Sequence, residues 1–225
     1  MGTITAGAII DKAEIILQDT TNARWPSDEL LGWLNDGQRE IVLQKPDSYA
    51  QNEAMELSSG TKQSIPSGGI QLIDVIRNMG ADGSTAGNVV RLIDRRILDD
   101  QNPDWHSEEQ DTSIEHYCFD DRDPKRFYVY PPADGTTQLE IVYASAPTSV
   151  SETTGTITLD DIYSNALLDY ILYRAYLKDA GYTANNQRAM SAFRSFMASL
   201  GKLDAKEMQT DPMVREGMLV RATQE

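Results

Sequence analysis

The sequence predicts an α+β fold in which terminal helices, two N-terminal and two long C-terminal, pack with a central, mostly antiparallel β-sheet. Three observations predict it. Apolar residues recur at helical spacing towards both ends of the chain. From Glu53 the middle breaks into short β-prone runs separated by Gly, Pro and Ser. After Glu207 the periodicity is lost, which indicates an extended C-terminal tail, either a frayed end or an arm that becomes ordered on a partner. We therefore expect one α+β domain over residues 1–207, with a β region at 53–146, and a C-terminal arm at 208–225.

The two N-terminal helices are expected at residues 3–18 and 27–45. The first has one apolar face, formed by Ala6, Ile9, Ile10, Ala13, Ile16 and Leu17. The second starts after Trp25-Pro26 with Ser27 as its N-cap, and Pro46 ends it. Its buried face is expected to contain Leu30, Leu31, Leu34, Ile41 and Val42. We expect Trp25 and Trp33 to pack in the core, because aromatic side chains bury large apolar areas.

Strands are expected near residues 54–57, 71–78, 89–94, 114–119, 127–130 and 138–145. The last of these alternates apolar and polar residues, as a sheet with one covered face requires. In the run from Phe127 to Tyr130 the same alternation places Phe127 and Val129 on one face and Tyr128 and Tyr130 on the other. Pro131 and Pro132 end its pairing, because proline has no N–H to donate.

The two C-terminal helices are expected at residues 160–180 and 184–205. The first is apolar on most of its sides, which predicts a central helix with neighbours on most sides. Gly181 is expected to stop it, and Thr183 to cap the next helix. The loop between them is short, so the two helices should be antiparallel neighbours.

Composition excludes several classes of function. The net charge is −15, the opposite of what a non-specific grip on nucleic acid needs. The acid is concentrated: residues 99–123 hold ten Asp or Glu and one Arg. The single cysteine, Cys118, excludes an internal disulfide. We expect no signal peptide and no membrane-spanning helix. The sequence has no nucleophile elbow, phosphate-binding loop or dinucleotide fingerprint, and we expect no cofactor.

Two groups of residues could bind metal, and each has a simpler interpretation. His106, His116 and Cys118 could be soft zinc ligands. They could equally be a buried thiol and a satisfied histidine on a sheet, which is what we expect, since no fourth ligand is evident. The acids at 108–111 and 120–123 could bind calcium, but the EF-hand spacing is missing and a solvated acidic face is expected.

A family resemblance rests on motifs that follow one another in the middle of the chain. In order they are Gly60-Thr61-Lys62-Gln63, Ile65-Pro66, Asp74-Val75-Ile76-Arg77-Asn78, Val90-Arg91-Leu92-Ile93-Asp94-Arg95, Pro103-Asp104-Trp105, His116-Tyr117-Cys118-Phe119-Asp120 and Asp123-Pro124-Lys125-Arg126-Phe127-Tyr128-Val129-Tyr130-Pro131-Pro132. From about Trp25 to Leu203 the chain resembles the head-to-tail adaptor (connector) proteins of tailed bacteriophages, a group that includes the tail tubular protein A of short-tailed phages.

The resemblance implies a structural virion protein of the phage neck that is not an enzyme. Such adaptors have terminal helices around a β core and form a ring, usually of twelve subunits, beneath the portal. The expected partners are therefore other copies of the chain, the portal protein, a tail or nozzle protein below, and double-stranded DNA that passes through the channel without specific binding. Adaptors of this type often hold the portal with a terminal extension.

Three sets of residues are candidates for these contacts. For the portal-docking arm they are Met213, Val214, Met218, Leu219 and Val220. For an acidic face towards the lumen or a neighbouring subunit they are Asp99, Asp100, Asp104, Glu108, Glu109 and Asp111. For a subunit interface they are Tyr128, Tyr130, Tyr173 and Tyr176. The alternative from a different class is a metal-dependent hydrolase or other binding protein that uses the acidic middle with His106 and His116.

Overall fold

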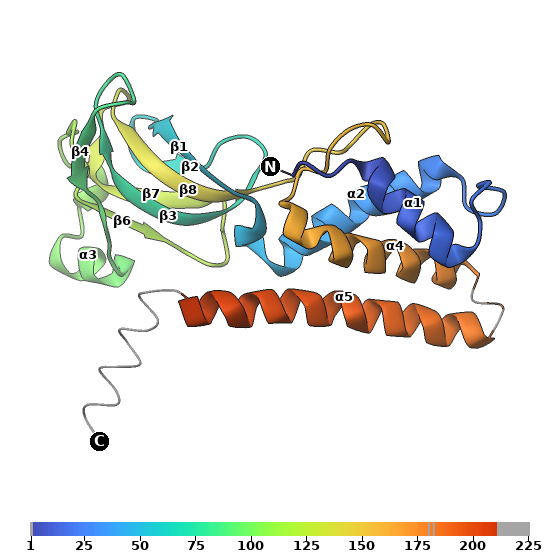
Figure 1. Ribbon diagram of the computed structural model, residues 1–225. Coiled ribbons are helices and arrows are strands. Elements are labelled where there is room, and N and C mark those ends of the chain that lie inside the picture. The colour runs from blue at the N-terminus through green and yellow to red at the C-terminus, as the bar shows by residue number, and fades with distance from the viewer. Residues whose placement is uncertain (1, 180, 182, 211–225) are drawn as a thin grey trace. The chain divides into compact units, whose positions relative to one another are not determined.

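The computed structural model describes residues 2–179, 181 and 183–210 (Figure 1). These residues form five α-helices and two four-stranded sheets, which confirms the α+β class. The chain divides into two compact units, where the sequence predicted one domain. The helical unit comprises Met1–Lys45 and Pro147–Glu225, and the β unit comprises Pro46–Ala146. The division is physically sensible because the two sheets have a common apolar core of their own.

In the helical unit, α4 (Ser164–Lys178) has the most helical neighbours among the described residues: α1 (Ala6–Leu17), α2 (Ser27–Gln44) and α5 (Thr183–Thr210) (Figure 1). Its buried residues lie on several sides, as the sequence predicted; they are Ala166, Leu167, Tyr170, Ile171, Leu172 and Ala175. The α-helix starts later than expected, because Asp160 caps a 3-10 turn, η3 (Asp161–Tyr163), that precedes it. Helix α5 continues through Gly201, which therefore does not end it.

The N-terminal helices follow the predicted faces with two corrections. The expected apolar residues of α2 are all buried, and Trp25 and Trp33 are buried with them. In α1, however, Ile16 is 47% exposed. The helix ends at Leu17, where Gln18 takes a left-handed conformation as its C-cap. Ser27 does not cap α2: it is the first helical residue, and its hydroxyl instead accepts a hydrogen bond from the Asn22 side chain.

Two amides on α2 tie the segment after the β unit to the helices. Asn35 pairs with the backbone of Val150 in both directions, at 2.9 and 2.8 Å. Gln38, almost fully buried, accepts a hydrogen bond from the Thr158 N–H at 2.7 Å. Because buried amides are costly unless paired, these contacts fix the course of residues 147–159.

The β unit contains two sheets rather than the single sheet that the sequence predicted. In one sheet the strand order is β1 (Ala50–Glu56), β8 (Gln138–Ser145), β3 (Gly69–Met79), β4 (Ala86–Val89). In the other it is β2 (Gly60–Ser64), β7 (Arg126–Ala133), β6 (His116–Phe119), β5 (Arg91–Leu92). Every pair is antiparallel except β5 with β6. Short helical segments lie at η1 (Pro46–Tyr49), α3 (Arg95–Gln101) and η2 (Trp105–Ser107).

Apolar side chains from both sheets form one core. Phe127 and Val129 are fully buried in it, as the alternation along β7 predicted. The prediction that Pro131 and Pro132 end the pairing was wrong, because β7 continues to Ala133, which pairs with Gly60. Strand β3 departs from alternation: its buried residues, Gly69, Leu72, Val75 and Asn78, recur every third position. Its pairing with β8 shifts register three times. A bulge inserts one residue, so the next buried side chain comes one position late.

Candidate assembly surfaces

The predicted acidic face is built on a short folded segment, residues 94–113. Asp94 accepts a hydrogen bond from the Arg96 N–H and so caps α3. Trp105 is buried and forms a small core with Leu98 and Cys118. Its indole N–H donates to Asp99 at 3.0 Å. The sequence showed the polar character of this segment but gave no sign that Trp105 anchors it.

All six predicted acidic residues are exposed, and they divide into two groups by their contacts. Asp99 holds Trp105, Glu108 accepts from the Asn102 amide, and Asp111 accepts from the Ser113 N–H. Asp100, Asp104 and Glu109, in contrast, make no side-chain hydrogen bond or ion pair with the described residues. Half of the acidic face is therefore needed to fold its own segment, and the other half is free for solvent or a partner.

The predicted tyrosines of β7 pack on this segment. The Trp105 ring meets those of Tyr128 and Tyr130 edge-on, with centroids 6.3 Å apart in both cases. Burial, together with a hydrogen bond to Glu108, raises the pKa of Tyr130. Both tyrosines are half-buried. Much of their apolar surface is thus covered within the chain, and the part left for a neighbouring subunit is correspondingly small.

The other two predicted tyrosines lie on α4 and face α5. The Tyr173 ring lies 5.0 Å from Phe193 and 5.9 Å from Tyr170, centroid to centroid. Arg188 lies over the Tyr176 ring at 5.8 Å. Both tyrosines are half-buried. They help to join the two C-terminal helices of one chain, so a role between subunits remains a proposal.

The candidate metal ligands differ in their partners: His106 makes a side-chain hydrogen bond, whereas the buried Nδ1 of His116 has no hydrogen-bond partner among the described residues, against the expectation of a satisfied histidine. His106 stacks on Trp105, with centroids 3.7 Å apart, and its Nδ1 pairs with the Thr61 hydroxyl at 2.8 Å. Cys118 is buried, and burial raises the pKa of its thiol to about 11. His116 is half-buried on β6, opposite Tyr130. Within the described part of the chain, no group of three or more His, Cys, Asp or Glu side chains could hold a metal ion.

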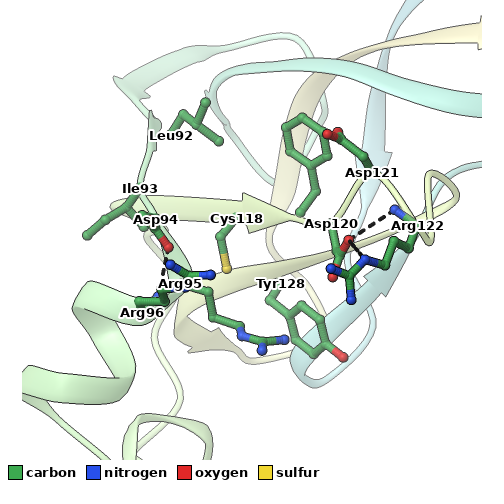
Figure 2. A pocket seen from close by; sticks show the side chains of 11 residues that line it. Leu92, Ile93, Asp94, Arg95, Arg96, Cys118, Asp120, Asp121, Arg122 and Tyr128 are labelled. Carbon is green, nitrogen blue, oxygen red and sulfur yellow. Dashed lines mark hydrogen bonds and ion pairs between the residues drawn. The ribbon is translucent and has the colours of Figure 1, made fainter.

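A hollow of about 670 Å³ opens beside Cys118, between the start of α3 and the turn after β6. Figure 2 shows Arg95 and Arg96 near Cys118 on one side of the hollow; on the other side, Arg122 points towards Asp120 in the same turn. Its lining mixes three arginines and three aspartates with apolar side chains; they are Leu92, Ile93, Asp94, Arg95, Arg96, Cys118, Phe119, Asp120, Asp121, Arg122 and Tyr128. Such a lining suits a protein surface better than a small apolar ligand.

Sequence reasoning missed a surface beside this hollow. Residues 86–98 carry three arginines against one aspartate, within a chain of net charge −15. Three large apolar side chains of the same stretch are exposed: Val89 by 60%, Leu92 by 61% and Ile97 by 45%. The local reversal of charge was a signal in the sequence; the exposure of the apolar residues was not.

The predicted arm residues, Met213, Val214, Met218, Leu219 and Val220, lie outside the described residues. Helix α5 extends through Thr210, so the first three residues of the predicted arm are helical. None of the helices among the described residues is long and apolar enough to cross a membrane.

Comparison with known proteins agrees with the fold and with the resemblance seen in the motifs. A search of curated proteins found no match. The model of the SU10 adaptor protein family, in contrast, matches residues 4–216, which is nearly the whole chain. Since this match includes both the helical unit and the β unit, the chain belongs to the SU10 adaptor protein family, a family of phage head-to-tail adaptors.

Proposed function

We propose that this protein is a structural adaptor that assembles as a ring beneath the phage portal, encloses the DNA channel and provides a platform for tail attachment. The observation that carries the proposal is the family match over residues 4–216. In keeping with the family, we propose twelve copies in the ring. We also propose that the protein lies in the virion neck, assembles in the host cytoplasm and has no catalytic activity.

Exposed apolar side chains support assembly into a larger complex. In the helical unit Ile15 is 66% exposed and Leu43 is 70% exposed, although both lie within helices. Ile162, Leu177, Met190 and Met197 are also exposed. Single apolar residues on a surface are ordinary, but this number in one unit is what an interface needs. Because the helices already pack on one another, we expect these residues to meet other chains.

The distribution of charge supports a wall that does not hold DNA. The β unit has eighteen acidic and eight basic residues, a net charge of −10, so it carries two thirds of the chain's charge. In a ring of twelve copies the chains would carry ~180 negative charges in total. Repulsion at the wall acts over about 10 Å at 0.1 M salt. We propose that the exposed acids Asp100, Asp104 and Glu109 contribute to this repulsion in the channel.

Docking on the portal is assigned to the C-terminal arm, residues 208–225. Its apolar residues have no helical or strand periodicity, as in segments that become ordered on a partner. Deleting residues 211–225 leaves the whole of α5 in place. We expect this truncated chain to keep its circular dichroism spectrum and thermal midpoint but to lose binding to the portal. Unchanged binding to the portal would refute the proposal that the arm docks on it.

The experiment that tests the proposed function is co-expression with the portal protein of the same phage, followed by native mass spectrometry and electron microscopy of the complex. The expected result is a closed ring of about twelve adaptor copies on the portal ring. A chain that binds the portal as one copy, or that does not bind it, would refute the proposal.

A further inference from the structure

The two sides of the β unit on which its sheets end differ in net charge. Strands β4 and β5 follow one another in the chain and form one edge of each sheet. Strands β1 and β2 do the same on the other side. Residues 86–98, which include β4, β5 and the start of α3, carry a net charge of +2. Residues 46–64, which include β1 and β2, carry a net charge of −2.

We propose that the edge of residues 86–98 binds the acidic β1 edge of a second copy of this chain, and that this contact joins neighbouring subunits of the ring. The proposal rests on the ring of the proposed function and adds the two surfaces that close it. A ring with cyclic symmetry needs a heterologous contact, in which two different surfaces of the chain meet. The two opposite sides of the β unit satisfy that requirement.

The surface formed by residues 86–98, which we call the receiving surface, is apolar and positively charged. Val89, Leu92 and Ile97 are exposed there by 60%, 61% and 45%. The exposed side chains of Arg91 and Arg96 make no ion pair with the described residues, so their charges are available to a partner. The hollow of about 670 Å³ opens into this surface, since its lining includes Leu92, Arg95 and Arg96 (Figure 2). An apolar centre with arginines is typical of protein interfaces.

The surface that would bind to it, the β1 edge, which we call the donating surface, is an open and regular edge strand. Over its seven residues β1 pairs with β8 without a register shift and without proline. Among the described residues it has no strand on its other side. Ala50, Asn52, Ala54 and Glu56 alternate along one face, and all four are exposed. Proteins commonly protect such an edge with a bulge, a proline or a covering segment. Here we propose that the next subunit covers it.

The sheet that contains β1 and β4 keeps its two edges far enough apart for each to contact a different neighbour. Three strand spacings separate β1 from β4, and each is about 4.8 Å, so the two edges lie about 14 Å apart across the sheet. One chain can therefore contact a different neighbour at each edge. The acids of the β1 edge are Glu53 and Glu56, on opposite faces of the strand, and the Glu53 carboxylate also accepts a hydrogen bond from the Tyr143 hydroxyl at 2.8 Å.

Variants that reverse the charge of one edge or the other test the contact. Variant A carries Arg91→Glu and Arg96→Glu, so that both of its edges are acidic. Variant B carries Asn52→Lys and Glu56→Lys, which leave the Glu53–Tyr143 bond in place and make both edges basic. A control, Lys12→Glu with Lys125→Glu, changes the net charge as much as variant A does, at exposed positions on neither edge. Circular dichroism and thermal midpoints verify that each variant folds.

Self-association is measured by native mass spectrometry and sedimentation over a range of concentrations at 0.1 M salt. We expect the wild type and the control to associate, and variants A and B alone to need at least about tenfold higher concentrations. A 1:1 mixture of A and B should associate as the wild type does, because each edge then meets its opposite charge. The associations of the wild type, the control and the mixture should all weaken at 1 M salt, where charges are screened beyond about 3 Å.

Two results would overturn the contact. One is self-association of variant A or variant B equal to that of the wild type; the other is a mixture that associates no better than its components. If rings still form on the portal with either variant alone, the contact is refuted while the proposed function stands. A wild-type chain that neither self-associates nor joins the portal would refute both.

Discussion

Replacement of Asn78 by alanine tests how the β4–β5 edge is held in place. Asn78 lies in the core with 7% of its surface exposed. Its side-chain N–H groups donate to the carbonyl oxygens of Asn88 at 3.0 Å and Ile114 at 2.7 Å. Its carbonyl oxygen accepts from the Ile114 N–H at 2.8 Å. One side chain therefore ties β3 to the segments that lead into β5 and β6.

The cost of Asn78→Ala follows from these three bonds. A buried hydrogen bond contributes about 1 kcal/mol net, and a partner left unpaired costs about 1–3 kcal/mol. Three bonds give a loss of about 3 kcal/mol at least. Domains of this size are stable by about 5–15 kcal/mol, so the variant should fold but with a much smaller margin. Asn78→Asp should cost no less, since it places a carboxylate beside two carbonyl oxygens.

Hydrogen–deuterium exchange in increasing urea measures this loss separately for each part of the chain. With a slope of about 2 kcal/mol per M, a loss of about 3 kcal/mol lowers the unfolding midpoint of β-unit peptides by about 1.5 M. In the absence of urea, the amide of Ile114 should also lose protection. Lys125→Ala, at an exposed position on neither edge of the β unit, is the control and should change stability by less than about 0.5 kcal/mol. A midpoint for Asn78→Ala equal to that of the control would refute the reasoning.

Three further predictions concern packing, pH and reactivity. A Cβ at Gly37 would lie 3.1 Å from Tyr170 and 3.2 Å from Leu167, so Gly37→Leu should overpack α2 against α4 and cost at least about 1–3 kcal/mol of stability. Gly32 has open space around it, so Gly32→Ala should stabilise α2 by up to about 1 kcal/mol. Equal thermal midpoints for the two variants would contradict this. The Ser84 hydroxyl and the backbone N–H groups of Ser84 and Thr85 lower the pKa of Asp82 from 3.8 to about 2. Because the folded pKa is the lower one, the stabilisation is present above pH ~4 and is lost as the pH falls towards 2. The thermal midpoint of Asp82→Ala should thus lie below the wild-type value above pH ~4, with a difference that shrinks towards pH ~2; a difference independent of pH would contradict it. Burial raises the pKa of the Cys118 thiol to about 11, so iodoacetamide at pH 8 should modify it slowly in the native protein and completely in urea, and fast native alkylation would show that the site opens.

Helical periodicity could be read from the sequence because each helix buries one face or more against its own unit. The apolar face of α2 and the wide apolar surface of α4 were predicted for that reason, and both are confirmed. The helix ends were harder: Ser27 has the residue type of a cap, yet Pro26 precedes the first turn and Ser27 bonds to Asn22. Local residue types predict that a helix starts there, and tertiary contacts decide which atom caps it.

The β unit was harder to predict, because its strands break the alternation on which prediction depends. Three bulges in β3 move the buried positions to every third residue. The strand expected at 89–94 is divided: Val89 ends β4 in one sheet, Arg91 and Leu92 pair with β6 in the other, and Asp94 caps α3. A change of sheet within three residues has no local signature.

The candidate surfaces were predicted unevenly. The acidic residues of 99–111 were identified from composition alone, since charge needs no knowledge of the fold. That Asp99 holds Trp105 could not be predicted, because the contact depends on how α3 and η2 fold. The β4–β5 edge was missed because its importance lies in exposure: Leu92 and Ile97 appear in the sequence as ordinary core residues.

Cryo-electron microscopy of the adaptor bound to its portal would show both the ring and the surfaces through which its subunits meet. We expect a closed ring of this chain in which the β4–β5 edge of each subunit, with Arg91 and Arg96, meets the β1 edge of the next. We also expect the C-terminal arm to contact the portal. A map with isolated copies on the portal, or with a ring whose neighbouring subunits meet through other surfaces and leave both edges in solvent, would contradict this expectation.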